Sequence, residues 1–171
     1  KNNKVFVGYN LRYDPVLQYL KKILKNKNIL ITNITCTSYL PNWRKRDYKK
    51  LYSASKLKGG GVHLDLSHEI DYANWIFNNL KKIDLRMKKL SNLKINSYDY
   101  TQLICTSNKS KFLNINLNYF SKKNQRYIEI YTNKEFIFVD LINRKVELSN
   151  FSKKQIKKFD NISSVKRMSL Q

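Results

Sequence analysis

Cysteine, glycine, proline and acidic residues are all scarce in this sequence of 171 residues, which has 2 Cys, 4 Gly, 2 Pro and 12 Asp and Glu. Because Cys36 and Cys105 are so few and so far apart, they argue against a disulfide framework or a zinc site, and we expect both to be reduced core residues. The chain has no apolar run of the roughly 18 residues that a membrane span needs, and no signal-peptide pattern. We therefore expect a cytoplasmic protein with no membrane partner.

The most unusual feature is the net charge of +22, which comes from 34 Lys and Arg against 12 Asp and Glu. Such a charge is typical of proteins that bind nucleic acid. Most of the basic residues are lysines spread along the chain, however, whereas bidentate contacts to bases or phosphates favour arginine. Alanine occurs only at Ala54 and Ala73, while Asn, Ile, Tyr and Lys abound, as in proteins of AT-rich genomes. A solvated basic surface is therefore favoured, and a basic nucleic-acid-binding module with tyrosine-rich strands is the alternative.

Hydrophobic periodicity divides the chain into a helical first part and a strand-rich second part. Residues 4–9 have a β-rich pattern. Asp14 and Pro15 form a typical N-cap and first-turn proline, and the apolar spacing after them predicts a helix. A β-branched run predicts a strand over residues 29–40. A polar and aromatic loop follows, and a second amphipathic helix is expected over residues 62–78.

Beyond residue 81, apolar and polar residues alternate, and the connections are short and rich in Asn or Ser. The strict alternation over residues 113–118 indicates a sheet with one covered face and one polar face. These patterns predict an α+β fold in which an open antiparallel sheet of about six strands packs against helices. The six strands expected after residue 81 are residues 83–90, 98–106, 112–120, 127–132, 135–140 and 145–148.

Three of the four glycines stand together at residues 59–61, directly before the second expected helix. On one helix, Asp65, His68 and Tyr72 would share a face, because they are spaced by three and four residues, and they could converge on one ligand. The glycines would let the backbone approach a bound molecule closely, and the free N–H groups at a helix start favour negative charge. Histidine is suited to proton exchange near neutral pH, and a carboxylate one turn away could orient it.

The same motif allows three other interpretations. A metal site is not expected, because His63 and His68 are five residues apart and lie about 140° apart around a helix. A Walker-type phosphate loop is not expected, because no Gly-Lys-Ser or Gly-Lys-Thr follows the glycines. A surface helix capped by a glycine turn, without a catalytic role, remains the alternative.

The glycine run followed by Asp65, His68 and Asp71 resembles the signature of the Gfo/Idh/MocA oxidoreductases, the family of glucose-fructose oxidoreductase and inositol dehydrogenase. Residues 9–15 are similar to the Asn-x-Arg-Phe-x-Pro element of that family. Residues 39–54 are similar to the substrate loop of members found with bacterial surface-sugar synthesis. One departure is the spacing from aspartate to histidine, which is three residues here and four in many members.

The resemblance implies a two-domain enzyme that transfers hydride between a hydroxyl-bearing carbon of a sugar, nucleotide sugar or polyol and NAD or NADP. In such an enzyme His68 would be the general base, and Asp65 would hold the substrate hydroxyl or orient the imidazole. Arg12 would lie near the nicotinamide and the substrate. The other expected contacts are Trp43, Arg44, Tyr48 and Tyr72 to the substrate and Gly60 and Gly61 to the cofactor. Structural ion pairs of the two arginines, and a core position for the tryptophan, are the alternatives.

The resemblance also implies how the whole protein is organised. Residues 1–8 would end a nucleotide-binding domain, residues 9–148 would form the substrate-binding and oligomerisation domain, and residues 149–171 would be a polar segment that is cut short. No Gly-x-Gly-x-x-Gly occurs in the sequence, so the Rossmann domain is expected upstream and this fragment alone would be inactive. An exposed apolar sheet face would pair subunits into a homo-dimer or tetramer. A non-catalytic assembly domain is the remaining alternative.

Overall fold

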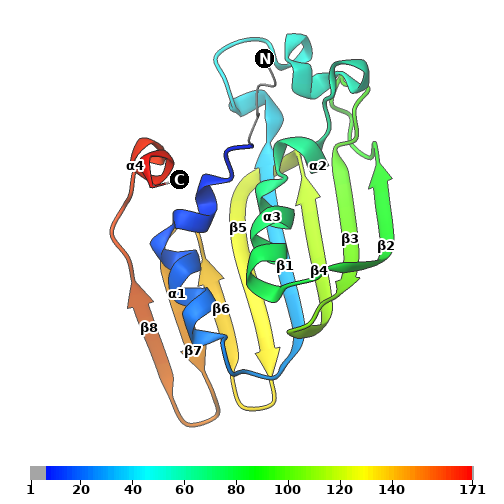
Figure 1. Cartoon of the computed structure of the whole chain (residues 1–171). Coiled ribbons are helices and arrows are strands. Elements are labelled where there is room, and N and C mark those ends of the chain that lie inside the picture. Colours follow the sequence, from blue (N-terminus) through cyan, green and yellow to red (C-terminus); the bar gives the residue numbers. More distant parts are fainter. Residues whose placement is uncertain (1–6, 171) are drawn as a thin grey trace, which may run out of the picture.

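The computed structural model describes residues 7–170, which form one eight-stranded sheet with helices on one face (Figure 1). The strands are β1 (Ile29–Tyr39), β2 (Lys81–Lys88), β3 (Tyr100–Thr106), β4 (Ser110–Asn118), β5 (Phe120–Thr132), β6 (Phe136–Asp140), β7 (Lys145–Ser149) and β8 (Lys154–Lys158). The helices are the 3-10 turn η1 (Asn10–Tyr13), α1 (Pro15–Ile23), α2 (Val62–Asp65), α3 (His68–Phe77) and α4 (Ser164–Ser169). Four further 3-10 turns lie between β1 and α2. The strand order is β2-β3-β4-β1-β5-β6-β7-β8, and α1 and α3 cover the same face of the sheet (Figure 1).

The predicted α+β class with a single open sheet is confirmed, with two differences. The sheet has eight strands, and it is mixed, because β1 runs parallel to β4 while all other neighbours are antiparallel. A parallel pair needs a long crossover, which is supplied here by the loop after β1, α2, α3 and the β2–β3 hairpin. Local alternation in a sequence does not reveal such a distant pairing.

Two elements that the sequence analysis did not predict are both polar. Strand β8 has the sequence Lys-Gln-Ile-Lys-Lys and all five residues are exposed, as is typical of an edge strand that lysines protect from further pairing. Helix α4 lies near η1 at the opposite end of β8 from the β7–β8 turn (Figure 1). Of the strand expected at residues 4–9, residues 4–6 lie outside the described part and residues 7–9 form no strand.

The helix expected over residues 62–78 is divided into α2 and α3, which corrects the prediction. Leu66 breaks it with φ −103° and ψ 30°, outside the helical region. Asp65 therefore ends one helix and His68 begins the next, so the single helical face expected to carry Asp65, His68 and Tyr72 does not exist.

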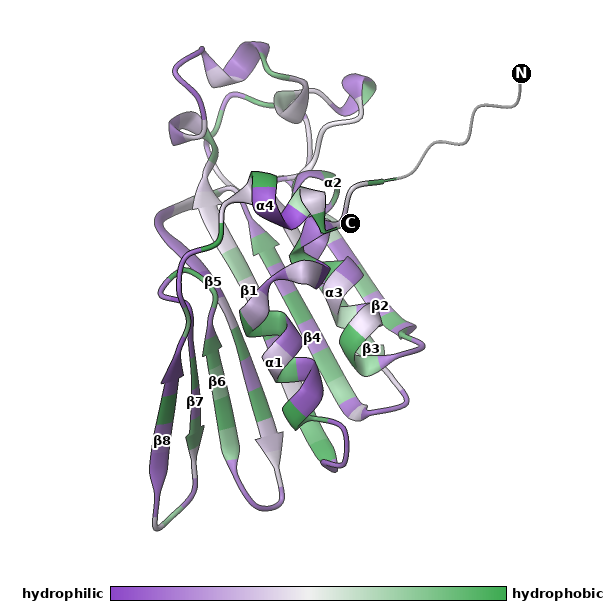
Figure 2. Cartoon of the chain, turned by 60° about the vertical axis from the view of Figure 1, so that its left-hand side comes forward, coloured by the Kyte–Doolittle hydropathy of each residue, from purple (hydrophilic) through white to green (hydrophobic). Residues whose placement is uncertain are grey.

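The core lies between the sheet and the two helices that cover it, where hydrophobic residues alternate with polar ones along the central strands (Figure 2). The period of two in β4 is confirmed, because its Leu113, Ile115 and Leu117 are fully buried while the intervening asparagines are half-buried on the other face. Both cysteines are buried and free, as expected. Burial raises the pKa of Cys36 to about 12. No helix among residues 7–170 is long and apolar enough to cross a membrane.

Asp14 joins the first helix to the end of the chain. Its side chain is buried and accepts a hydrogen bond from the N–H group of Val16, so it caps α1 as the sequence predicts. The same carboxylate pairs with the guanidinium groups of Arg144 at 3.0 Å and Arg167 at 3.1 Å. One buried carboxylate thus fixes α1, the end of the β6–β7 turn and α4.

We predict that Asp14→Ala lowers the free energy of unfolding by about 3 kcal/mol, because it removes a helix cap and leaves two arginines without their buried partner. Urea denaturation of the two proteins measures the change. The matched control is Asp47→Ala, since Asp47 caps the short exposed turn at Tyr48–Lys50 and has no ion pair among the described residues. We expect this control to cost below about 1 kcal/mol. Equal losses in the two variants would contradict the role given to the arginines.

Candidate functional site

The three adjacent glycines join the loop after β1 to α2. Gly59 and Gly61 have φ angles of 76° and 142°, which L side chains rarely adopt. A Cβ added at Gly60 would lie 2.2 Å from the carbonyl oxygen of Tyr52 and 2.7 Å from that of Ser53. Only glycine therefore lets this turn pack against the Tyr52 loop, and this packing brings α2 next to Tyr52.

Asp65 is held by two tyrosines that the sequence analysis did not single out. The hydroxyl of Tyr119, between β4 and β5, donates to Oδ2 of Asp65, and the hydroxyl of Tyr52 also hydrogen bonds to this carboxylate. Burial and the bond to Asp65 raise the pKa of Tyr119, and the bond to Asp65 and burial raise that of Tyr52. Both tyrosines therefore stay protonated donors at neutral pH. Within residues 7–170 no hydrogen bond joins Asp65 to His68.

His68 lies at the start of α3, where its half-buried ring packs edge-on against Tyr9 with centroids 5.5 Å apart. Its Nδ1 atom is buried and has no hydrogen-bond partner among the described residues. Burial and the positive charge of Arg126 lower the pKa of His68 below 6.5. The imidazole is therefore neutral at pH 7, which is the form that can accept a proton.

A buried ion pair lies next to this histidine. Glu69 is fully buried, and its Oε1 accepts a hydrogen bond of 2.5 Å from Nε of Arg126 on β5, while its Oε2 has no partner among the described residues. The negative charge of Glu69 raises the pKa of His68 and partly offsets the effect of Arg126. Because a single glutamate in an amphipathic helix is usually exposed, no signal in the sequence indicated this pair.

Tyr72 of α3, which was expected to contact the substrate, is fully buried, and burial raises the pKa of its hydroxyl well above 10. It belongs to the core and does not line an open site.

Arg12 forms a bidentate ion pair with Asp71, with Nε 2.8 Å from Oδ2. The structural ion pair that was the alternative role for this arginine is therefore present. The pair joins η1 to α3. The side chain of Arg12 remains 41% exposed.

The three expected sugar contacts in the loop after β1 differ in their surroundings. Trp43 packs edge-on against Tyr119, with ring centroids 5.1 Å apart, and is partly buried against the core. Tyr48 is half-buried, and its hydroxyl accepts a hydrogen bond from the N–H group of Lys94. Arg44 is exposed, and its positive charge acts on Tyr52. The structure thus gathers Trp43 with the Asp65 cluster and directs Tyr48 toward another loop.

The residues of the glycine-to-aspartate motif therefore divide into two groups. One is the Asp65 cluster with its two tyrosines, and the other is His68 with the charged residues of α3 and β5. In the part of the chain that the structure describes, no group of three or more His, Cys, Asp or Glu side chains could hold a metal ion.

Several solved structures share this fold. The chain matches an oxidoreductase from Agrobacterium radiobacter, in complex with NAD+, L-tartaric acid and magnesium, with a TM-score of 0.73 and 16% identity over 95% of this chain and 50% of that one. It matches UDP-N-acetylglucosamine 3-dehydrogenase from Acidithiobacillus ferrooxidans with a TM-score of 0.70 and 13% identity, over 96% of this chain and 49% of that one. A super-repressor mutant of Gal80p from Saccharomyces cerevisiae gives a TM-score of 0.78 and 11% identity over 98% and 50%.

These matches show that the chain has a fold that is also found in these two oxidoreductases and in Gal80p. The chain spans about half the length of the structures it matches. No family model and no curated protein matches the sequence.

The charges around the two histidines of this chain predict separate responses. Glu69→Gln removes a negative charge that raises the pKa of His68, so the pKa of His68 should fall further below 6.5. His63, whose pKa is lowered by burial and raised by Asp65, should not respond to this change. Asp65→Asn should lower the pKa of His63 and leave that of His68 unchanged. NMR titration of both imidazoles in this chain measures all four effects.

The internal control is the histidine that each substitution does not reach, and amide spectra show whether each variant keeps its fold. If Asp65→Asn lowered the pKa of His68 as much as that of His63, Asp65 and His68 would be coupled directly. That outcome would overturn the division of the site into two groups.

Proposed function

We propose that this chain is the substrate-binding and oligomerisation domain of an oxidoreductase that uses NAD or NADP and acts on a hydroxyl of a sugar, nucleotide sugar or polyol. The observation that carries the proposal is the neutral, half-buried His68, placed beside a glycine-anchored turn in a fold shared with NAD-binding dehydrogenases. The similarity of residues 39–54 to a substrate loop extends the proposal to the synthesis of surface-polysaccharide sugars.

In the proposed reaction, His68 removes the proton from the substrate hydroxyl while hydride leaves the same carbon. The bound nicotinamide would supply the hydride acceptor. Because Nδ1 of His68 is buried, Nε2 is the atom that a substrate can reach. The Asp65 carboxylate, fixed by Tyr52 and Tyr119, would accept a hydrogen bond from a second hydroxyl, and the half-exposed Tyr52 would lie beside the sugar.

The residues present fit one edge of such a cofactor and not its phosphates. Arg12, which pairs with Asp71 of α3 and stays partly exposed, would be the residue of this domain that lies near a bound nicotinamide. The sequence has no Gly-x-Gly-x-x-Gly, so a separate domain would hold the pyrophosphate. Gly60 and Gly61 are themselves buried in this domain, and their main contribution is to position α2.

The decisive test uses the full-length protein that contains this chain. We predict that His68→Ala lowers kcat for NAD(P)-dependent oxidation of the sugar substrate by about 10²–10⁴-fold, because it removes the general base, while NAD(P) binding is retained. Turnover is followed by nicotinamide absorbance with a panel of sugars and nucleotide sugars. His63→Ala is the matched control and should keep activity within a few-fold. Retained turnover in His68→Ala would exclude His68 as the base.

A second candidate function is a non-catalytic assembly or regulatory role. The observation that favours it is the match to Gal80p, a protein described as a super-repressor mutant, over nearly the whole of this chain. If the full-length protein binds NAD(P) but turns over no sugar of the panel, this second function is favoured.

We also propose that two copies of the chain associate through the sheet face that no described helix covers. On this face β1, β4, β5 and β6 carry a cluster of apolar side chains and asparagines around Glu129 of β5. The apolar residues of the cluster are Ile31, Phe112, Tyr127, Tyr131, Phe136 and Phe138. Glu129 lies among them, opposite Asn33 and Phe138, and the ammonium group of Lys145 on β7 lies 6.0 Å from the centroid of the Phe138 ring, so the face carries one charge of each sign and little net charge.

Substitution in the centre of this face tests the association. We predict that sedimentation equilibrium finds a dimer or tetramer for the wild-type chain and a monomer for Phe138→Lys, because a buried ammonium would face its own copy. Leu57→Lys is the control, since Leu57 is an apolar residue that is 96% exposed elsewhere. A monomeric wild-type chain, or equal dissociation in the two variants, would contradict this interface.

A further inference from the structure

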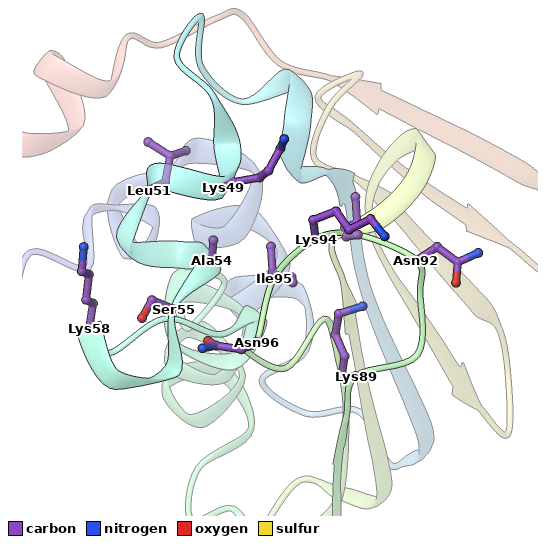
Figure 3. A pocket seen from close by; sticks show the side chains of 11 residues that line it. Lys49, Leu51, Ala54, Ser55, Lys58, Lys89, Asn92, Lys94, Ile95 and Asn96 are labelled. Atoms are coloured by element: carbon purple, nitrogen blue, oxygen red, sulfur yellow. The ribbon is translucent and has the colours of Figure 1, made fainter.

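A cavity of about 780 Å³ lies between the loop that follows β1 and the loop that joins β2 to β3 (Figure 3). His68, Asp65 and the individual residues expected to contact the substrate or cofactor do not line it, although Lys49, Leu51 and Ala54 belong to residues 39–54, the segment that is similar to a substrate loop. The lining residues are Lys49, Leu51, Ala54, Ser55, Lys58, Lys89, Asn92, Leu93, Lys94, Ile95 and Asn96.

The charge of this cavity is of one sign. Four lysines line it and no carboxylate does, whereas each of four smaller cavities is lined by at least one Asp or Glu. Lys89 pairs with the buried Asp99 at 3.2 Å. The ammonium groups of Lys49, Lys58 and Lys94 have no ion-pair partner within residues 7–170. Three lysines without an ion-pair partner therefore line one cavity.

The walls of the cavity are joined to each other by hydrogen bonds. The N–H group of Asn96 donates to the carbonyl oxygen of Ala54 at 3.1 Å, and the side-chain oxygen of Asn96 accepts from the N–H group of Lys56 at 2.8 Å. Ser97 donates to the carbonyl oxygen of Ser53 at 2.6 Å. These hydrogen bonds fix the two loops relative to each other, so the cavity is formed without a ligand.

We propose that this cavity binds a phosphorylated small molecule. Ammonium groups are common partners of phosphate oxygens. Ser55 adds a neutral donor from the loop after β1, and Asn92 adds one from the loop that joins β2 to β3. The volume is in the range of roughly 300–1,000 Å³ that small-molecule sites have, and it exceeds the space that one phosphate group fills. Leu51, Leu93 and Ile95 give the non-phosphate part of the ligand an apolar surface. This site does not depend on the dehydrogenase chemistry proposed above.

Charge-matched variants test the site in the chain as it exists. In the first variant Lys49, Lys58 and Lys94 are changed to Gln, and in the control Lys25, Lys81 and Lys111, which line none of the five cavities, are changed to Gln. Both variants lose three positive charges. Binding of inorganic pyrophosphate and of uridine diphosphate is measured by calorimetry and by NMR shifts, at low and at physiological salt.

We expect saturable binding of one uridine diphosphate to the wild-type chain, with NMR shifts at residues of the two loops. The cavity variant should bind at least about tenfold more weakly, whereas the control should stay within about threefold. Equal weakening in both variants would assign binding to the overall positive charge and would overturn the proposal. Absence of binding to wild type would also overturn it, as would a single-stranded oligonucleotide that binds through the same loops and displaces the small ligand.

Discussion

The placement of β1 between β4 and β5 is the constraint on which the candidate site depends. Its parallel register with β4 sets Cys36 opposite Leu117, and its antiparallel register with β5 sets Cys36 opposite Arg126. Arg126 thereby faces the helices and meets the buried Glu69 of α3. Where β1 ends, the N–H group of Leu40 donates to the carbonyl oxygen of Tyr119, the residue whose hydroxyl holds Asp65. Both groups of the site are therefore positioned from one central strand.

Acidic and basic residues are distributed differently between the interior and the surface of this protein. Seven of the 12 acidic residues take part in ion pairs, and several of these, such as Asp14, Glu69 and Asp99, are buried where they fix a helix or a loop. Most lysines have no such partner and lie at the surface. The carboxylates are therefore used for folding, and the outer surface is more uniformly positive than the sequence alone suggests. This division explains how a cavity can be lined by four lysines and no acid.

Features that depend on neighbouring residues could be read from the sequence, and features that depend on distant pairing could not. The cap at Asp14, the helix after Pro15 and the alternation in β4 are local, and the structure confirms them. The break of the helix at Leu66 could not be predicted from the sequence, because the apolar stripe of residues 62–78 continues through it. Glu69 and Arg126 are 57 residues apart, so no short sequence pattern could predict that they form an ion pair. Tyr72 fitted the helical spacing of the motif, but spacing does not tell which side of a helix faces the core.

The divided helix changes which groups determine the chemistry of His68. A carboxylate one turn away on the same helix could orient the imidazole, and this is one of the roles that the sequence predicts for Asp65. Asp65 instead receives hydroxyl hydrogen bonds from two tyrosines, and the largest effects of charge on the pKa of His68 come from Arg126 and Glu69. Burial and Arg126 lower the proton affinity of the imidazole, and the adjacent glutamate limits that effect. Since a general base must be neutral at working pH yet still attract a proton, these opposed charges are compatible with the role proposed for His68.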